Sequence, residues 1–454
     1  MRITLKMALV AAITLALLVP LLMVRGVIAE RQAYRAEAVA DVERAYAGPQ
    51  AFAGPVLTVP YTESVDVETT DRAGLPVKVR RRVQKQWTFF PTRLDVSGPV
   101  APDTRRRGIY EVQVYAWSGA VHARFDAVIP PDAPAGAERV IGRPWLGYAI
   151  ADVRGIRGAP RLSIDGRTVP LAGGQGAREG AGLHARLPAP AAGQPIRLDT
   201  RLAIDLAGSE SLAVVPLGTG NRIALRSTWR HPSFQGMSPL RSRVDGSGFH
   251  AEWRVASVAT DVQRQYLAGR GALPLTPSRS SGIEAAPGGG LDTLGVVFAD
   301  PVDAYTQADR ATKYGLLFVL LTFVGFFMFE VIRALPIHPI QYLLVGLALA
   351  IFFLLLVSLS EHLRFGAAYL IASIACVGLI GFYVSAVLRS AARGAGFAAM
   401  LGLLYAALYG LLVSEDNALV LGAGLLFVVL AAVMIVTRKL DWYRAGAQVN
   451  VGRA

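Results

Sequence analysis

Two groups of side chains in this sequence could recognise a ligand. The first lies in the run Trp229-Arg-His231-Pro232-Ser233-Phe234, which joins an indole, an imidazole and a phenyl ring. Aromatic rings stack on sugars and peptides, and an imidazole exchanges hydrogen bonds and protons near neutral pH. We therefore treat Trp229, His231 and Phe234 as a candidate site for a glycan or a peptide. The alternative is a structural corner, in which the proline fixes the backbone, the tryptophan fills the core and the histidine caps carbonyl groups.

The second group is mainly acidic and lies within or beside apolar segments near the C-terminus. Its members are Glu330, Glu361, His362, Glu415 and Asp416. Ionisable residues inside membrane segments commonly belong to a proton, ion or substrate path. We therefore treat these five as candidate functional positions that could bind a cation or a polar headgroup. The alternative is a helical ion pair of Glu330 with the arginine three residues later, and short polar loops in water for the others.

Enzymatic chemistry has no comparable support in the sequence. The motifs His-Glu-x-x-His, Gly-x-Ser-x-Gly and Ser-x-x-Lys and the Walker loop do not occur. The six histidines are scattered without ligand spacing, and Cys376 is the single cysteine. The net charge is +13, but the basic residues are spread along the chain rather than gathered in a stripe. We therefore expect no enzyme activity, no cofactor, no metal and no nucleic-acid partner.

The last third of the chain is almost continuously apolar, and short polar breaks divide it into five segments. They are Tyr314–Ile332, Pro339–Ser360, Phe365–Leu388, Phe397–Val413 and Ala418–Val436. Each is close to the roughly 20 apolar residues that cross a hydrocarbon core about 30 Å thick. A further run, Met7–Val24, is longer than the core of a signal peptide, so we favour an uncleaved anchor over a signal peptide cut after Ala29. The sequence therefore predicts a polytopic membrane protein with six transmembrane helices.

The distribution of basic residues predicts the orientation of these helices. Six crossings place both termini on one side, and that side receives Arg2, Lys6, Arg333, Arg389, Arg393, Arg438, Lys439 and Arg444. Cytoplasmic loops carry an excess of Lys and Arg. We therefore predict a multi-pass protein of the bacterial inner membrane with both termini in the cytoplasm and residues of about 30–312 in the periplasm. That segment contains no cysteine, so it does not rely on disulfide bonds.

The predicted periplasmic segment has the pattern of one helix followed by many strands. Glu30–Tyr46 contains no Pro or Gly and predicts an exposed helix that continues from the first span. Gly54-Pro55 then marks the start of a first strand. Alternating apolar and polar side chains follow in runs such as Tyr110–Tyr115 and Gly248–Val255, separated by Gly, Pro and Asp. This pattern predicts a large antiparallel β-rich domain built as one or two sandwiches.

Several longer motifs match one known family. The external segment contributes Ala47-Gly48-Pro49-Gln50, Gly54-Pro55 and the run from Trp229 to Gly236. The membrane segments contribute Lys313-Tyr314, His338-Pro339-Ile340-Gln341-Tyr342, Ser358-Leu359-Ser360-Glu361-His362, Glu415-Asp416-x-Ala418-Leu419 and Thr437-Arg438-Lys439-x-Asp441-Trp442-Tyr443. In these motifs the chain resembles the CreD (Cet) family of inner-membrane proteins. The resemblance implies control by a two-component system and a role in envelope integrity, colicin tolerance and the response to β-lactams. It implies no catalytic residues.

These observations predict five regions along the chain. They are an N-terminal transmembrane anchor at 1–28, a juxtamembrane helix at 30–47, a periplasmic β-rich domain at 48–312, a five-helix transmembrane bundle at 314–436 and a cytoplasmic tail at 437–454. We expect the outer domain to sense or bind an envelope component, either a protein or a glycan. The bundle, surrounded by membrane lipids, would anchor it or transmit the event. The alternative is a transporter or lipid-handling protein, which would need polar residues inside a bundle that has few beyond Ser, Thr and Tyr.

Overall fold

The computed structural model describes residues 3–70, 76–130, 138–176, 178–272, 274, 290–298, 304–333, 338–414 and 418–438. The chain divides into two compact units. The helical unit consists of Met1–Ala36 together with Val302–Ala454, and the β unit consists of Glu37–Pro301. The β unit is therefore inserted in the sequence between the first helices and the remaining ones.

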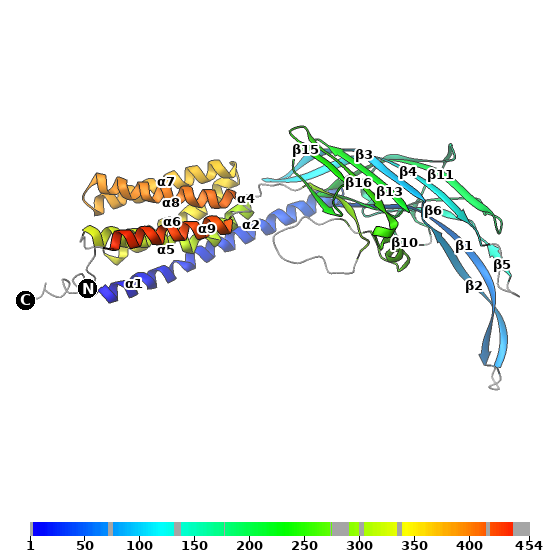
Figure 1. Cartoon of the computed structure of the whole chain (residues 1–454), viewed down its shortest axis with the longest axis horizontal. Helices are drawn as coiled ribbons and strands as arrows, with labels where there is room; N and C mark the ends of the chain where they lie inside the picture. Colours follow the sequence, from blue (N-terminus) through cyan, green and yellow to red (C-terminus); the bar gives the residue numbers. More distant parts are fainter. Residues whose placement is uncertain are drawn as a thin grey trace, which may run out of the picture. The chain divides into compact units, whose positions relative to one another are not determined.

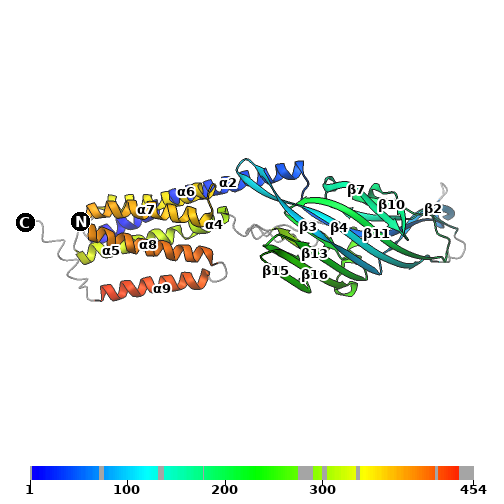
Figure 2. The same ribbon diagram turned by 90° about the horizontal axis from the view of Figure 1, so that it is seen from above.

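The helical unit is built from helices, most of them apolar (Figures 1 and 2). They are α1 (Ile3–Ala16), α2 (Leu18–Ala45), α4 (Ala304–Lys313), α5 (Gly315–Arg333), α6 (Pro339–Ser360), α7 (Phe365–Val387), α8 (Ala391–Val413) and α9 (Ala418–Thr437). In the described residues, four helices are long and apolar enough to cross a membrane: Ala8–Ala45, Pro339–Ser360, Phe365–Val387 and Ala391–Val413. Helices suit this environment because they satisfy their own backbone hydrogen bonds without water.

A fifth candidate span is broken into two helices. Tyr305–Lys313 and Gly315–Phe327 meet at a bend of 47°, and together they meet the same requirements of length and composition. The apolar part of α9, Val420–Ile435, is shorter. The described residues therefore contain four candidate spans, or five with the bent pair, and the predicted total of six stays a prediction.

The α4 helix was not predicted from the sequence. Its residues are polar on average, but Tyr305, Ala308, Ala311 and Thr312 lie on one helical face and are buried. The predicted β-rich domain extends to residue 312, whereas α4 packs within the helical unit. A polar average conceals a narrow apolar stripe of this kind, because only the spacing of the buried residues reveals it.

Local capping residues set the starts of two helices. His338 accepts a hydrogen bond from the N–H of Ile340, and the side chain of Gln341 accepts one from the N–H of His338. This capping box, with Pro339 in the first turn, begins α6. The hydroxyl of Ser390 caps α8 in a similar way, so that α8 begins at Ala391, earlier than the predicted span at residue 397.

The β unit consists of two sheets. Sheet A has nine strands in the order β14-β17-β12-β1-β6-β10-β9, with β2 and β5 also paired to β1; sheet B has eight in the order β15-β16-β13-β3-β4-β11-β7-β8. The strands of sheet A are β1 (Gln50–Thr70), β2 (Pro76–Phe89), β5 (Arg139–Ile141), β6 (Trp145–Ile150), β9 (Ala172–Gln175), β10 (Arg178–Arg186), β12 (Ser211–Val215), β14 (Pro232–Gly236) and β17 (Leu294–Phe298). Those of sheet B are β3 (Arg93–Arg107), β4 (Tyr110–Val128), β7 (Ile156–Ile164), β8 (Arg167–Val169), β11 (Pro195–Ser209), β13 (Gly220–Ser227), β15 (Arg241–Asp245) and β16 (Gly248–Ala256).

One apolar core lies between the two sheets. Phe52 of sheet A meets Trp117 of sheet B edge to face, with ring centroids 5.7 Å apart, and Tyr148 of sheet A packs beside Phe52. Buried and exposed side chains alternate along β4, as expected for a strand with one face on a core. The structure therefore confirms the predicted sandwich and shows that its two sheets share a single core.

The predicted antiparallel pairing holds for most neighbouring strands and is wrong for two pairs. β1 runs parallel to β12, with Gln50 opposite Leu212, and β3 runs parallel to β13, with Arg93 opposite Gly220. These partners lie 162 and 127 residues apart in the chain. Alternation of side chains gives no information about strand direction, so the sequence pattern could not distinguish these pairs.

Gly54-Pro55 lies inside β1 and does not begin it, which corrects the predicted strand boundary. The pairing of β1 with β6 shifts between Ala53 and Val56, so that the two residues form an irregularity within the strand. Gly54 has a φ of +124°, and an added Cβ would lie 2.8 Å from the carbonyl oxygen of Gly147. A glycine is required here because any side chain would meet the neighbouring strand.

Candidate functional site

The Trp229–Phe234 corner, defined as residues 229–234, turns its aromatic rings inwards. The indole N–H of Trp229 donates to the backbone oxygen of His231 at 2.8 Å, and its ring meets Phe298 edge-on at 6.3 Å. Phe234 meets Trp253 edge-on at 5.8 Å. Both rings are partly buried and pack against the sandwich core. These contacts are those of a structural corner, and they leave little aromatic surface for stacking on a ligand.

His231 is, with Arg230, one of the two exposed residues of the corner. Its side chain is exposed, and the following strand, β14, forms one end of sheet A. Gly236 ends that strand with a φ of +76°, where an added Cβ would collide with the carbonyl oxygen of Thr293. Of the three candidate residues at this corner, His231 is therefore the one that could contact a ligand. Binding of a ligand by His231 stays a proposal.

A second motif, ending at Gln50, joins three segments of the β unit. The buried amide of Gln50 donates to the carbonyl oxygens of Asp152 and Ala207, both at 2.9 Å. It also accepts from the N–H of Asp152 at 3.2 Å. The carboxylate of Asp152 accepts a hydrogen bond from the N–H of Gly48 at 3.0 Å. The pKa of this carboxyl group is lowered, chiefly by the hydrogen bond from Arg154. This motif therefore fixes the start of β1 on the loop that follows β6.

Glu361 connects three helices at the end of α6. One of its carboxylate oxygens lies 3.3 Å from Nε of Arg31 on α2 and 3.3 Å from the hydroxyl of Tyr305 on α4. The Glu361 side chain is 11% exposed and that of Arg31 is 42% exposed. We call these three residues the Glu361 clamp. The neighbouring His362 is exposed in the turn before α7.

The remaining acidic candidates fall outside what the structure describes. Glu415 and Asp416 lie outside the described residues, between α8 and α9. Glu330 belongs to α5, but its side chain lies outside the described part. The predicted convergence of the acidic residues at one face therefore stays a prediction. Within the described residues, no three His, Cys, Asp or Glu side chains gather as a metal site would require.

A buried polar network links α6, α7 and α8. The hydroxyl of Tyr405 donates to Sγ of Cys376 at 3.1 Å, and the thiol of Cys376 donates to the carbonyl oxygen of Ala348 at 3.4 Å. The hydroxyl of Tyr369 donates to the carbonyl oxygen of Tyr405 at 2.8 Å. A polar group in a hydrocarbon environment is costly unless it finds a partner within the protein. The network therefore holds the three helices in register.

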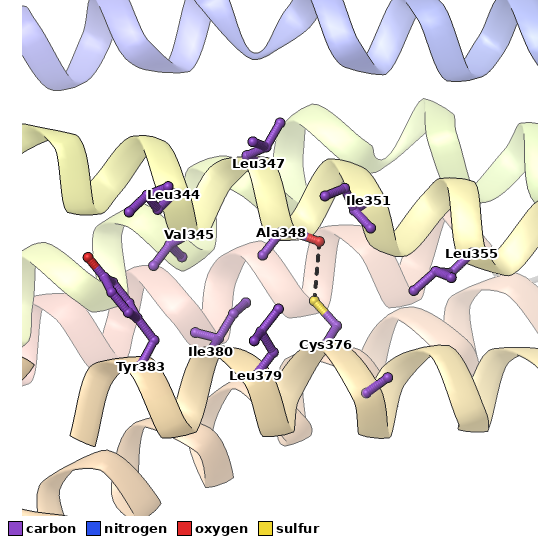
Figure 3. Close-up of a pocket in the computed structure, with 11 residues that line it drawn as sticks. Leu344, Val345, Leu347, Ala348, Ile351, Leu355, Cys376, Leu379, Ile380 and Tyr383 are labelled. Carbon is purple, nitrogen blue, oxygen red and sulfur yellow. Dashed lines mark hydrogen bonds between the residues drawn. The ribbon is translucent and has the colours of Figure 1, made fainter. Parts of the chain in front are cut away.

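An apolar groove lies beside this network, between α6 and α7 (Figure 3). It has a volume of about 360 Å³ and is lined from Leu344 to Leu355 on α6 and from Ala375 to Tyr383 on α7. Figure 3 shows Leu344 and Tyr383 at one end, Cys376 near the middle and Leu355 at the other end. The groove could not be predicted from the sequence because its lining has the composition of any lipid-facing helix. Only the packing of two helices shows which of these apolar residues face a hollow.

Together, these features define a polytopic membrane protein with a β sandwich inserted in the sequence between its helices. The sequence profile of the family described as "Inner membrane protein CreD" matches residues 2–443. The chain is also 35% identical over 442 residues to Inner membrane protein CreD of Escherichia coli (strain K12), which covers 96% of this chain and 93% of that protein. The chain therefore belongs to the CreD family of inner membrane proteins, and the family resemblance of its motifs is confirmed.

Proposed function

We propose that this inner membrane protein supports the integrity of the cell envelope without an enzymatic activity. In this proposal the β unit faces the periplasm and senses or binds an envelope component, and the helical unit transmits that event in the membrane. The observation that carries the proposal is α2, one continuous helix from Leu18 to Ala45 that contributes residues to both units. A helix transmits a displacement better than a flexible linker does, because hydrogen bonds fix each turn to the next.

Side chains hold α2 within each unit. In the β unit, Val39 and Val42 pack against Val112 and Val114 in a small apolar cluster. There the hydroxyl of Ser209 also donates to Glu43 at 3.0 Å. In the helical unit, the Glu361 clamp holds α2 through Arg31. Binding at the β unit would therefore act on a helix that side-chain contacts hold in both units.

An interruption of α2 tests this coupling. Insertion of Gly-Gly-Ser-Gly between Ala36 and Glu37 creates a flexible joint, and insertion of seven helix-forming residues is the matched control. Seven residues make about two turns and preserve the direction of each helix face. Each variant is expressed in an Escherichia coli strain that lacks its own CreD protein, and envelope integrity is measured by dye uptake and colicin survival. We expect the flexible variant to fail and the helical variant to complement at equal membrane levels. Full complementation by the flexible variant would overturn the proposal.

Recognition of an envelope component has a separate test at the Trp229–Phe234 corner. His231→Ala should fold normally because the side chain is exposed, and His250→Ala, at an exposed histidine of β16 outside the corner, is the control. Both are compared in the same complementation assay. Loss of complementation in folded His231→Ala alone would support ligand binding at the corner. Equal behaviour of the two variants would show that the corner is structural.

Lipid handling is a second candidate function, favoured by the apolar groove between α6 and α7. A protein with this function moves lipid between leaflets or between partners. Purified protein in vesicles should then accelerate the movement of a fluorescent phospholipid from one leaflet to the other. Unchanged movement would exclude that form of lipid handling and would favour the sensing function.

A further inference from the structure

We propose that the groove between α6 and α7 is a binding site for one acyl chain of a membrane phospholipid. Both helices are long and apolar enough to cross a membrane, and the lining residues Leu347, Ile351 and Leu379 are 43%, 47% and 61% exposed, so the groove faces out of the helical unit towards lipid. The inference goes beyond the proposed function, since a sensor and a lipid-handling protein could each hold a resident lipid. The inference rests on the dimensions of the groove, on its lining and on the positions of its two polar side chains, Cys376 and Tyr383.

The dimensions fit a single hydrocarbon chain. Leu344 and Leu355 lie eleven residues apart on α6, which is about 16 Å at 1.5 Å per residue. This length is roughly half of a hydrocarbon core about 30 Å thick, and so close to the depth of one leaflet.

The lining favours a hydrocarbon occupant. Apart from Cys376 and Tyr383, the residues that line the groove are aliphatic. The thiol of Cys376 already donates to Ala348 and accepts from Tyr405, so its hydrogen bonds are used within the protein. An empty groove would forfeit dispersion contacts on every wall, and the bilayer interior supplies no water to fill it. An acyl chain regains those contacts without breaking a hydrogen bond.

Small side chains leave room for the groove, and hydrogen bonds between the helices preserve its shape. Ala348 on α6 and Ala375 on α7 are small residues of the lining, and the larger Leu344 and Leu355 lie towards its two ends (Figure 3). The hydrogen bonds of Cys376 and Tyr405 hold α6, α7 and α8 against one another. A site that exists before its ligand arrives loses less conformational entropy on binding. The groove therefore binds a chain more tightly than the open helix surface beside it.

Tyr383 sets the direction of the bound lipid. It lies four residues before the end of α7 at Val387, and its hydroxyl lies at the same end of the groove as Leu344 (Figure 3). Tyrosine favours the membrane–water interface, where its ring is apolar and its hydroxyl is wet. Beyond this end, Arg389 and Arg393 are exposed and can attract a phosphate. The headgroup therefore lies at the Tyr383 end and the methyl end of the chain near Leu355.

Photo-crosslinking of the full-length protein in nanodiscs tests this proposal. The probe is a phosphatidylglycerol that carries a diazirine in one acyl chain, and mass spectrometry maps the adducts. Leu370 and Ile374, also on α7, are controls because they are 61% and 64% exposed but lie outside the groove, whereas Leu379 is 61% exposed and lines it. We expect at least fivefold more adducts on Leu379 than on either control. A diazirine near the headgroup should label the Tyr383 end, and one near the methyl end should label Leu355.

Substitutions that fill the groove complete the test. Ala375→Leu places bulk inside the groove, and Ala367→Leu places the same bulk on an exposed part of α7 outside it. Ala375→Leu should reduce groove adducts at least fivefold, and Ala367→Leu should leave them unchanged. Ala348→Val on the opposite wall provides a second variant if Ala375→Leu unfolds. Equal adducts on groove and control residues, or persistence of groove adducts in both filled variants, would overturn the proposal in favour of ordinary annular lipid.

Discussion

Gln50 shows how one buried amide can hold segments that are distant in the sequence. Gln50→Leu would leave the carbonyl oxygens of Asp152 and Ala207 and the N–H of Asp152 without their partner. Each buried group left unpaired costs about 1–3 kcal/mol, so we expect the free energy of unfolding to fall by about 3 kcal/mol or more. Denaturant unfolding followed by tryptophan fluorescence measures this loss. Gln86→Leu, at an exposed position on β2, is the control and should change stability by less than about 0.5 kcal/mol. Similar losses in both variants would contradict this role of Gln50.

Glu252 gives the β unit a defined response to acid. Arg222 and Arg254 donate to its carboxylate at 2.9 and 2.8 Å and lower its pKa from 4.5 to about 2. Because the folded state holds the charged form, this contribution to stability is full above about pH 4.5 and disappears as the pH falls towards 2. Glu252→Gln should therefore be less stable than the natural protein at pH 7, and the difference should vanish near pH 2. The unfolding midpoints of both proteins, measured between pH 7 and pH 2, test this prediction. A difference in stability that does not change with pH would contradict the role of Glu252.

At the residue scale, the sequence predicted which side chains are unusual but not how they are used. Trp229 and Phe234 stood out as candidates for stacking, yet their rings pack against other aromatic rings of the β unit. The same residue types serve recognition and packing, and only the contacts distinguish the two. Glu361 was identified as a polar residue at a helix end. Its contacts with Arg31 and Tyr305 depend on the folding of distant segments and leave no local signal.

At the scale of elements, close packing of α7 and α8 depends on a glycine. A Cβ at Gly394 would collide with the side chain and the backbone of Ser385 on α7. Gly394→Ala must push the helices apart, and such overpacking costs about 1–3 kcal/mol. Gly402→Ala is the control because its Cβ would meet open space within the same helix, and it should be neutral or stabilising by about 0.5–1 kcal/mol. Thermal unfolding followed by circular dichroism should show a lower midpoint for Gly394→Ala and an unchanged or higher midpoint for Gly402→Ala, and a loss of the same size in both would contradict the packing role.

The predictability of elements follows from how local their signals are. The ends of α6 agree with the prediction from sequence because an apolar run and its cap are both local features. The start of α8 was placed too late, since Arg393 resembled a loop residue while Ser390 had already capped the helix. The parallel partner of β1 could not be predicted, because pairing depends on residues brought together only by the fold.

At the scale of the whole molecule, the orientation in the membrane remains the main prediction to test. In a Cys376→Ser background, Ile109→Cys reports on the β unit and Arg393→Cys on the first turn of α8; both positions are exposed. The excess of basic residues on one side predicts that an impermeant maleimide labels Ile109→Cys in intact spheroplasts. Arg393→Cys should react only after the membrane is permeabilised. The reverse pattern of labelling would invert the orientation.

The parallel pairing of β1 with β12 also governs the order in which the chain can fold. The two strands lie 162 residues apart, and synthesis at about 5–20 residues per second separates their emergence by roughly 8–32 s. During that interval, the part of β1 that pairs with β12 is an apolar strand with a free edge, which is prone to aggregate. We expect nascent chains that end before Ser211 to be retained by a holdase chaperone and chains that extend beyond Phe298 to be released. Release of both would show that β1 is protected in another way.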